Sequence, residues 1–431
     1  MHHAEINSTN RMSTKRQFTR VATAGITFQA GSSAIDSATI MSALIFQLTG
    51  STVLVGAVTA ILRFGWLFPQ LIVGYLAQRS GSSMHYYAIG AFGRASCMAL
   101  LAITLVIGAQ LPNARLAIAV MVLWTVYSFV SGIVAVPYND IVARAVPSEL
   151  RSRLLATRFF GGGVLALGVV AIADKLVSSF PFPQSYAVII SLASILMFVS
   201  SMVFTTVGES KAREDKENKS SFIQYLKEGI NVFHDDRQFR LYVYAQWCGG
   251  AVLMAMPFYV VQASVSGFQL ERVALLLGGQ TLGALSSNLL WGWWGDKLGK
   301  GHLMRVIALG RVLPPIAIIA LATSGSLDKD MTLFAYVAIF FVLGALANGL
   351  TISVIGFLME ISPDHLRPAY SGYFNAMTAP AFLLPLLAGI LIAYTGLLAV
   401  FVISMIAGSL QFYFMLLVGR NEYKKQPHNN N

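Results

Sequence analysis

The sequence predicts an all-α protein that crosses a membrane many times. Of its 431 residues, 56% are hydrophobic and only 11% are charged, and the mean hydropathy is +0.65. A soluble domain carries about 25% charged residues, so this chain has too few to cover a water-exposed surface. A transmembrane β-barrel would instead show alternating segments of about ten residues. The composition therefore favours membrane-spanning helices.

Twelve apolar runs are long enough to cross a bilayer as helices, which takes about 20 residues each. They lie at residues 21–48, 52–77, 86–108, 116–138, 155–178, 184–206, 240–262, 272–294, 303–324, 331–357, 370–393 and 397–419. The polar segment 207–239 separates six runs from six. We therefore predict a tail (1–20), a six-helix bundle (21–206), a middle loop (207–239), a second six-helix bundle (240–419) and a C-terminal tail (420–431).

The distribution of basic residues predicts the orientation in the membrane. With the N-terminus in the cytoplasm, 23 of the 30 lysines and arginines fall in cytoplasmic segments and 4 in external ones. Cytoplasmic loops carry the excess of basic residues, so both termini are expected in the cytoplasm, and the membrane is expected to be a bacterial inner membrane. The net charge of +11 thus reflects topology and does not indicate nucleic-acid binding.

Three features recur in the two halves at nearly one offset, which is about half the chain. Gly74 and Gly292 each close the second run of their half. The other two features recur at almost the same offset: Gly93-Arg94 with Gly310-Arg311, and Pro147-x-x-Leu150-Arg151 with Pro363-x-x-Leu366-Arg367. An internal repeat with six spans in each copy gives two parallel halves, and such an architecture places a binding site near the membrane midplane.

The stretch "GWWGDKLGKG" (292–301) follows the eighth run, and "GYLAQRSGSS" (74–83) is its weaker counterpart after the second. A short turn between helices needs glycine where φ is positive or backbones approach closely. Asp296 is expected to face the positive N-terminal end of the next helix, while Lys297 and Lys300 hold the loop on the cytoplasmic side. Such a contact holds one conformation and breaks in another, although a well-made turn needs the same residues.

These loops resemble the loop that follows the second span of each half in the major facilitator superfamily. Gly292, Asp296, Lys297, Gly299 and Lys300 fall on that family pattern, and the first copy keeps Gly74, Arg79 and Gly81 but has Gln78 in place of the acid. The resemblance implies a monomeric twelve-helix transporter of two pseudo-symmetric bundles that rock about a central site, with gating roles for these loop residues.

Ionisable side chains inside a membrane are costly and are functional candidates. Asp36 lies in the first run, and Gln29 and Ser33 precede it at helical spacing, which predicts a polar stripe on one helix face. Asp36 is a candidate for binding a proton or a cation, or for pairing with an arginine. Arg63, in the second run, is a candidate for binding an anion or for a structural salt bridge with Asp36.

Arg94 and Arg311 occupy equivalent places in the third and ninth runs, so we expect a scaffold role for both. Charged residues near the cytoplasmic ends of the runs are candidate gate contacts: Asp140, Arg144, Arg151, Arg153, Arg158, Glu360 and Arg367. Asp140 and Arg144 are also spaced as an ordinary helix-surface pair. Prolines 257, 314, 315, 380 and 385 are expected to kink their helices.

Uncharged polar residues inside the runs are either substrate ligands or hydrogen-bonding contacts between helices. The candidate ligands are Gln29, Ser33, Tyr127, Gln246, Asn348 and Asn375. The sequence alone leaves both interpretations open.

The favoured function is secondary active transport of a small organic anion, zwitterion or sugar, since three intramembrane arginines stand against one aspartate. Asp36 is the candidate for proton coupling. The sequence has no phosphate-binding loop G-x-x-x-x-G-K-[ST], so ATP is not expected to drive it. No H-E-x-x-H or G-x-S-x-G motif occurs, so no enzyme activity, metal site or cofactor is expected. Transport of a metal ion or cationic drug, and a non-transporting sensor or scaffold, remain the alternatives.

Overall fold

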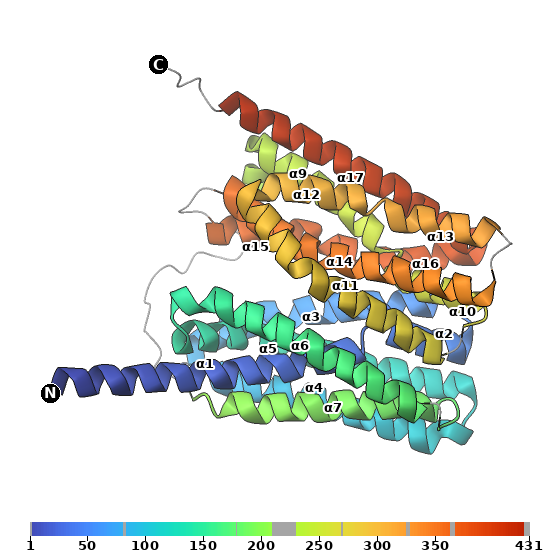
Figure 1. The fold of residues 1–431 in the computed structure, drawn as a ribbon, viewed down its shortest axis with the longest axis horizontal. Coiled ribbons are helices and arrows are strands. Elements are labelled where there is room, and N and C mark those ends of the chain that lie inside the picture. Colours follow the sequence, from blue (N-terminus) through green and yellow to red (C-terminus); the bar gives the residue numbers. More distant parts are fainter. Residues whose placement is uncertain are drawn as a thin grey trace. The chain divides into compact units, whose positions relative to one another are not determined.

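The computed structural model describes residues 2–80, 83–177, 179–208, 230–268, 270–324, 328–362 and 367–425, and every regular element in these ranges is a helix (Figure 1). Contacts divide the chain into two compact units. The first comprises Met1–Glu214 with Gly267–Gly278, and the second comprises Asp215–Ser266 with Gly279–Asn431. Most of the middle loop that we predict, residues 209–229, lies outside the described ranges, and its boundaries stay a prediction.

The first unit packs seven α-helices side by side. They are α1 (His2–Ala34), α2 (Ile40–Thr49), α3 (Thr52–Ser80), α4 (Ser83–Ile107, followed by the 3-10 turn η1, Gly108–Gln110), α5 (Asn113–Ala145), α6 (Ser148–Val177) and α7 (Gln184–Thr205). Helix α5 packs against both α3 and α4, while α1 packs against α6 and α7. These contacts enclose the cavity described below.

The second unit holds the remaining helices. They are α9 (Arg237–Leu253), α10 (Met256–Val265), most of α11 (Leu270–Lys297), α12 (Lys300–Gly310), α13 (Leu313–Ser324), α14 (Lys329–Ile361), α15 (Arg367–Thr378), the 3-10 turn η3 (Ala379–Leu383), α16 (Leu384–Thr395) and α17 (Leu397–Lys425). Helix α17 packs against α9 and α12, and α12 also packs against α14. Asp236 caps α9 by accepting from the amides of Gln238 and Phe239.

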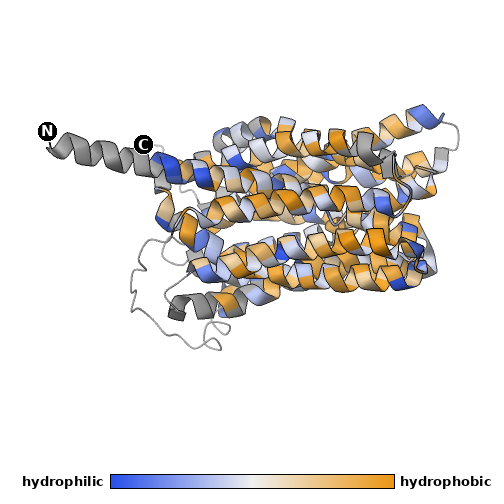
Figure 2. Cartoon of the chain, turned by 90° about the horizontal axis from the view of Figure 1, so that it is seen from below, coloured by the Kyte–Doolittle hydropathy of each residue, from blue (hydrophilic) through white to orange (hydrophobic). Residues whose placement is uncertain are grey.

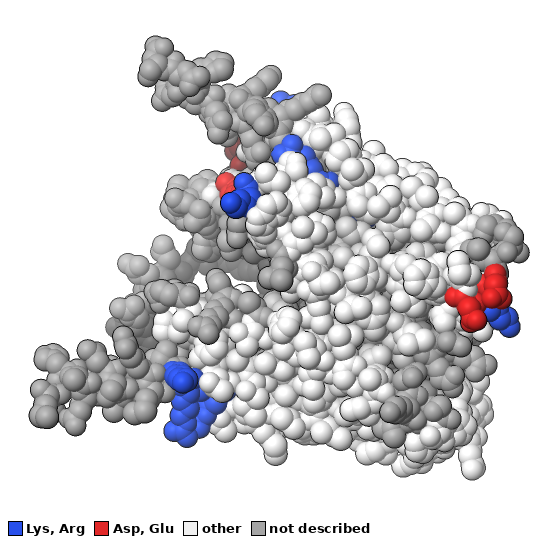
Figure 3. Space-filling model, in the orientation of Figure 1, with Lys and Arg blue, Asp and Glu red and all other residues white. Residues whose placement is uncertain are grey.

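The helices are apolar along most of their length (Figure 2). Within the described residues, nine helical segments are long and apolar enough to cross a membrane, and the three other predicted runs coincide with α1–α2, α6 and α11. Large apolar side chains lie on the outside, such as Ile107 at 77% exposure. On the face shown in Figure 3, charged side chains gather toward the left and right sides, and the surface between them is uncharged. This pattern is that of a protein whose exterior contacts lipid.

The first span of each half is interrupted at the same place. Helix α1 ends at Ala34 and α2 begins at Ile40, while α9 ends at Leu253 and α10 begins at Met256. Helices α2 and α10 each have 10 residues, and their first residues are separated by the same offset as Pro147 and Pro363 of the sequence repeat. The predicted continuous helix through the first run is therefore wrong, because the backbone between residues 35 and 39 is not helical.

Prolines explain several of the other interruptions. Pro257 lies in the first turn of α10, Pro380 in that of η3 and Pro385 in that of α16. Proline lacks an N–H and is tolerated in the first turn of a helix, where the amide has no intrahelical partner. A new helical segment thus starts at each of these three prolines, where we predict a kink. No proline lies between residues 35 and 39, so the interruption between α1 and α2 has a different cause.

The repeat also appears in how closely helices cross. A Cβ on Gly65 of α3 would lie 2.7 Å from the Cβ of Ser128 on α5. In the second unit, a Cβ on Gly283 of α11 or on Gly344 of α14 would collide with the backbone oxygen of Phe341 or Gln280, respectively. Gly65 and Gly283 are separated by the same offset as Gly74 and Gly292. Small residues thus bring two membrane helices into backbone contact in both halves.

Candidate functional site

Asp36 lies in the interruption of the first span. Its Oδ1 accepts hydrogen bonds from the amides of Ala38 and Thr39 and from the hydroxyl of Thr39, each at 3.0 Å. These donors belong to the turn that leads into α2, so the carboxylate holds this turn by local hydrogen bonds between side chain and backbone. The predicted stripe of Gln29, Ser33 and Asp36 on one helix face is wrong, since Asp36 is not part of that helix.

The charge of Arg63, on α3, interacts electrostatically with that of Asp36. Helices α2 and α3 pack together within the first unit, which brings the two residues near each other. The side chain of Arg63 is exposed at the surface of the protein. A membrane-depth acid at a helix break therefore has a basic neighbour on α3, and loss of either charge would alter the other's environment.

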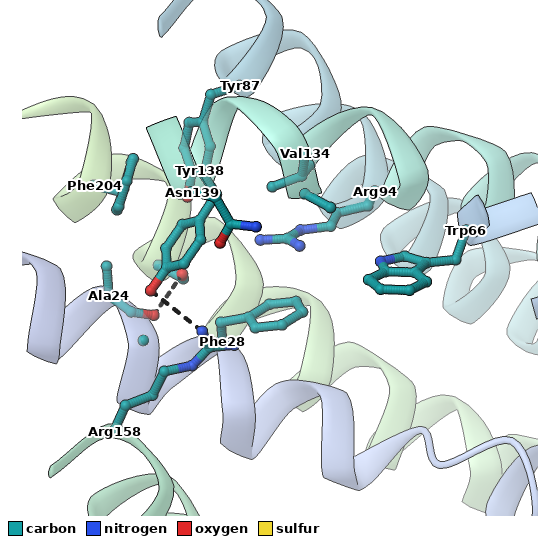
Figure 4. Close-up of a pocket in the computed structure, with 13 residues that line it drawn as sticks. Ala24, Phe28, Trp66, Tyr87, Arg94, Val134, Tyr138, Asn139, Arg158 and Phe204 are labelled. Carbon is teal, nitrogen blue, oxygen red and sulfur yellow. Dashed lines mark hydrogen bonds between the residues drawn. The ribbon is translucent and has the colours of Figure 1, made fainter. Parts of the chain in front are cut away.

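A cavity of about 230 Å³ lies inside the first unit (Figure 4). Residues from α1, α3, α4, α5, α6 and α7 line it, and two of them are arginines: Arg94 from α4 and Arg158 from α6. Aromatic side chains form much of the wall, including Phe28, Trp66 and Tyr138. Figure 4 shows both guanidinium groups pointing into the space that these rings surround.

Arg94 is only 5% exposed, and its guanidinium carbon lies 3.8 Å from the centroid of the Phe28 ring. This distance is that of a cation–π contact. Within the described part of the chain, the buried Nε of Arg94 has no hydrogen-bond partner. Stacking on Phe28 covers the flat face of the guanidinium, whereas its N–H groups lie at the edge.

Arg158 donates a 3.2 Å hydrogen bond from Nη1 to the hydroxyl of Tyr138, and its guanidinium carbon lies 5.3 Å from the ring centroid of the same tyrosine. Its Nε is also buried without a hydrogen-bond partner among the described residues. Gly25 makes room for it, since a Cβ there would lie 2.8 Å from both Cγ and Cδ of Arg158. Sequence reasoning considered Arg158 only as a gate partner, although its place just inside the fifth apolar run was a signal.

Arg311 differs from Arg94, its counterpart in the repeat. Nη1 donates to Oε1 of Gln411 and Nη2 donates to the carbonyl of Gly249, both at 2.8 Å. Arg311 is 6% exposed, so two of its buried donors are used inside the second unit. The arginine thus ties α9 and α17 to the end of α12, as a scaffold residue does.

The uncharged candidates fall into different settings. The amide of Asn348 donates to Oδ1 of Asn288 at 2.6 Å and to the carbonyl of Ala284 at 3.0 Å, and so links α14 to α11. Tyr127 is buried and stacks on Trp124. Gln246 has a buried Nε2 without a partner in the described ranges, whereas Asn375 is exposed. Among these residues, only Asn348 is engaged as a contact between helices by the bonds described.

Gln29 and Ser33 are the remaining candidates, and both belong to α1. The side chain of Gln29 lies against α6. A Cβ on Gly162 would lie 2.5 Å from the Cβ of Gln29. Ser33 lies near the end of α1 and is partly buried. The structure therefore brings Arg94 and Arg158 together in one cavity and brings Asp36 near Arg63, while the other predicted ligands are distributed over both units.

The candidate gate residues are described only in part. Asp140 forms an i,i+4 ion pair with Arg144, with Nε donating to Oδ1 at 3.0 Å, and also accepts from the hydroxyl of Ser83. Glu360 accepts at 3.4 Å from the amide of Lys300, at the start of α12. Several predicted gate residues lie outside the described residues or have undescribed side chains: Gly74, Arg79, Gly81, Arg151, Asp296 and Arg367.

The loop after α11 has the predicted backbone geometry. Gly299 has φ +87°, a conformation that residues with a side chain rarely adopt. Lys297 is exposed at the end of α11. The side chain of Lys300 packs beside Gly356, where a Cβ would lie 2.8 Å from its Cγ. Around Gly292 a Cβ would meet nothing within 4 Å, so crowding does not explain that glycine.

Two repeated helical bundles with broken first spans, apolar exteriors and buried charges define a polytopic membrane protein of the carrier type. The chain belongs to the major facilitator superfamily, whose family model matches residues 21–379 and 264–431. It is therefore a multi-pass membrane transporter of this superfamily and not an enzyme. The expected fold of twelve transmembrane helices in two six-helix bundles is confirmed.

Solved transporters share this fold at low sequence identity. The nucleoside transporter NupG is 14% identical with a TM-score of 0.66, over 95% of this chain and 100% of that chain. The xylose transporter XylE from E. coli, in a partially occluded inward-open conformation, is 14% identical with a TM-score of 0.62, over 96% and 100%. A mutant of the peptide transporter POT is 13% identical with a TM-score of 0.68, over 94% of each chain. A comparison with curated protein sequences finds no significant match.

Proposed function

We propose that this transporter moves a small organic anion, zwitterion or sugar by alternating access, and that Asp36 couples the movement to a proton. The observation that carries the proposal is the carboxylate at the break in the first span. In many secondary transporters, interrupted helices near the membrane midplane hold the substrate and the coupling ion. The matching break between α9 and α10 holds Met254 and Ala255, which are both apolar, so this acid belongs to one half alone.

The hydrogen bonds of Asp36 suit a group that gains and loses a proton. All three bonds described above use Oδ1, which leaves Oδ2 as the oxygen that takes the proton. Protonation there keeps the turn into α2 intact but removes the attraction to Arg63. Proton binding would thus change how strongly α2 is held to α3, and this supplies a route from protonation to helix movement.

Both arginines of the cavity and Arg63 favour a solute that is anionic, or that is polar and uncharged as a whole. The solved structures with this fold include transporters of nucleosides, xylose and peptides. A metal ion or cationic drug would face the positive potential of three arginines. The proposal also places the protein in a bacterial inner membrane as a monomer, with both termini in the cytoplasm.

The test is uptake into proteoliposomes with an acidic outside, using labelled uridine, xylose, alanyl-alanine and benzoate as probes. We expect at least one probe to accumulate against its gradient with the wild type. Asp36→Asn should lose this accumulation but still exchange the probe across the membrane, because the amide keeps an oxygen for the turn. Asp330→Asn, at the exposed start of α14, is the matched control and should behave as wild type.

Two results would contradict the proposal. Gradient-driven accumulation that is unchanged in Asp36→Asn would exclude proton coupling through this residue. Absence of flux for every probe, in vesicles that hold correctly folded protein, would favour the sensor or scaffold alternative.

A further inference from the structure

We propose that the cavity between Arg94 and Arg158 binds the carboxylate of a small organic acid, whose flat apolar body lies against the aromatic wall. The inference names the substrate class of the proposed transporter and so rests on the proposed function. The structure points to an anion because two cationic groups face one cavity that no acid lines: the lining residues, all within the described ranges, include neither Asp nor Glu.

The two guanidinium groups have hydrogen-bonding capacity that the described protein residues leave unused. The Nε atoms of Arg94 and Arg158 are both buried, and both lack partners in the described part of the chain. A buried donor without a partner costs free energy, more so when it is charged. A carboxylate has two oxygens that accept from arginine N–H groups in a paired geometry. One bound carboxylate would therefore satisfy donors from both arginines.

Electrostatics favours the same ligand. The charges of Arg94 and Arg158 act on each other across the cavity, and two like charges in a low-dielectric site repel. A single negative charge placed between them adds two attractions that offset this repulsion. The contact of Arg94 with Phe28 is a cation–π contact, which leaves the hydrogen-bonding capacity of Nε unused.

Arg311 shows what the same repeat position looks like when the protein supplies the partners. There, the side chain of Gln411 and the carbonyl of Gly249 accept from Nη1 and Nη2. An arginine at this position therefore does not require a ligand in general. Arg94 has the ring of Phe28 beside it instead, and its buried Nε has no hydrogen-bond acceptor among the described residues.

The size and lining of the cavity limit the ligand. Sites for drug-sized ligands have about 300–1,000 Å³, so a cavity of about 230 Å³ suits a smaller molecule. Phe28, Trp66, Tyr138 and Phe204 present ring surfaces, and Asn139 adds an amide (Figure 4). A planar ring that carries one carboxylate matches this combination, and benzoate is the simplest such probe.

The experiment is equilibrium binding to the full-length protein in detergent, read by thermal shift and by tryptophan fluorescence, since Trp66 lines the cavity. Benzoate should raise the melting temperature, whereas benzamide, its uncharged analogue, should not. Arg94→Gln and Arg158→Gln should each weaken benzoate binding by about 10- to 100-fold, the effect of losing a charged hydrogen bond. Arg305→Gln, whose arginine bonds Gly301 in the other unit, is the matched control and should bind as wild type.

A second measurement separates binding from folding. Without ligand, Arg94→Gln should melt no lower than wild type, because the change removes a buried charge that lacks an acidic partner. Arg94→Lys keeps the charge but not the planar fork, and should bind benzoate weakly as well. A purely structural Arg94 would instead give a lower melting temperature with unchanged benzoate affinity in the folded fraction.

The inference is overturned if benzamide stabilises as well as benzoate, if both glutamine variants bind within twofold of wild type, or if benzoate does not bind up to about 10 mM. Inorganic phosphate that binds in place of benzoate would exclude the carboxylate assignment. The measurement needs no gradient, so binding that persists in a protein without transport would contradict the proposed function alone. Transport of a neutral probe without benzoate binding would contradict this inference alone.

Discussion

Gly132 on α5 lies directly against the backbone of α3, and its replacement by alanine tests how rigid this contact is. A Cβ on Gly132 would lie 2.6 Å from the carbonyl oxygen of Trp66 and 2.7 Å from that of Gly65. Pro69, inside α3, has no N–H to bond the carbonyl four residues earlier, which is that of Gly65. The freed carbonyl faces Gly132, so the absence of a side chain there is part of the helix contact.

The magnitude follows from the distances. Real Cβ atoms essentially never approach other atoms closer than 3.0 Å, so both carbonyls must retreat from the positions given above. Both oxygens belong to backbone, which cannot rotate away as a side chain can. Overpacking of this kind costs about 1–3 kcal/mol. Alanine also gains helix propensity over glycine, by about 1 kcal/mol, and a control must remove that gain.

Gly168→Ala on α6 is that control, because a Cβ there meets nothing within 4 Å. Reversible unfolding in mixed micelles should show Gly132→Ala to be about 1–3 kcal/mol less stable than Gly168→Ala. The control itself should be at least as stable as wild type. Equal stability of the two variants would refute the inferred close approach of α3 and α5.

Two further substitutions test the second unit. Arg311→Gln should lower the free energy of unfolding by about 2–4 kcal/mol, because the acceptors on Gln411 and Gly249 lose their charged donor. A melting temperature equal to that of Arg94→Gln would contradict the contrast between the two arginines. Gly299→Ala should lower the free energy of unfolding by about 1–3 kcal/mol, since φ +87° is strained for alanine. Gly292→Ala should lower it less, because a Cβ there meets nothing within 4 Å. Equal losses in the same unfolding assay would refute the need for glycine at position 299.

The sequence by itself determined the membrane location, the helical spans and the repeat. These depend on composition and on local chemistry: apolar runs of sufficient length, prolines such as Pro257 that restart helices, and Gly299 in a turn with positive φ. Each of these signals acts within a few neighbouring residues, so each can be seen without knowing the fold.

Only the tertiary structure decided what the buried charges do. Arg94 and Arg311 stand in the same Gly-Arg motif of the two halves, yet one stacks on Phe28 of α1 and the other bonds Gln411 of α17. The helix break at Asp36 contains no proline, so the sequence does not predict it. Arg158 lies near Arg94 only because α6 and α4 line the same cavity. The partners of a buried charge come from helices distant in the sequence, and its hydrogen bonds and electrostatic environment depend on those partners.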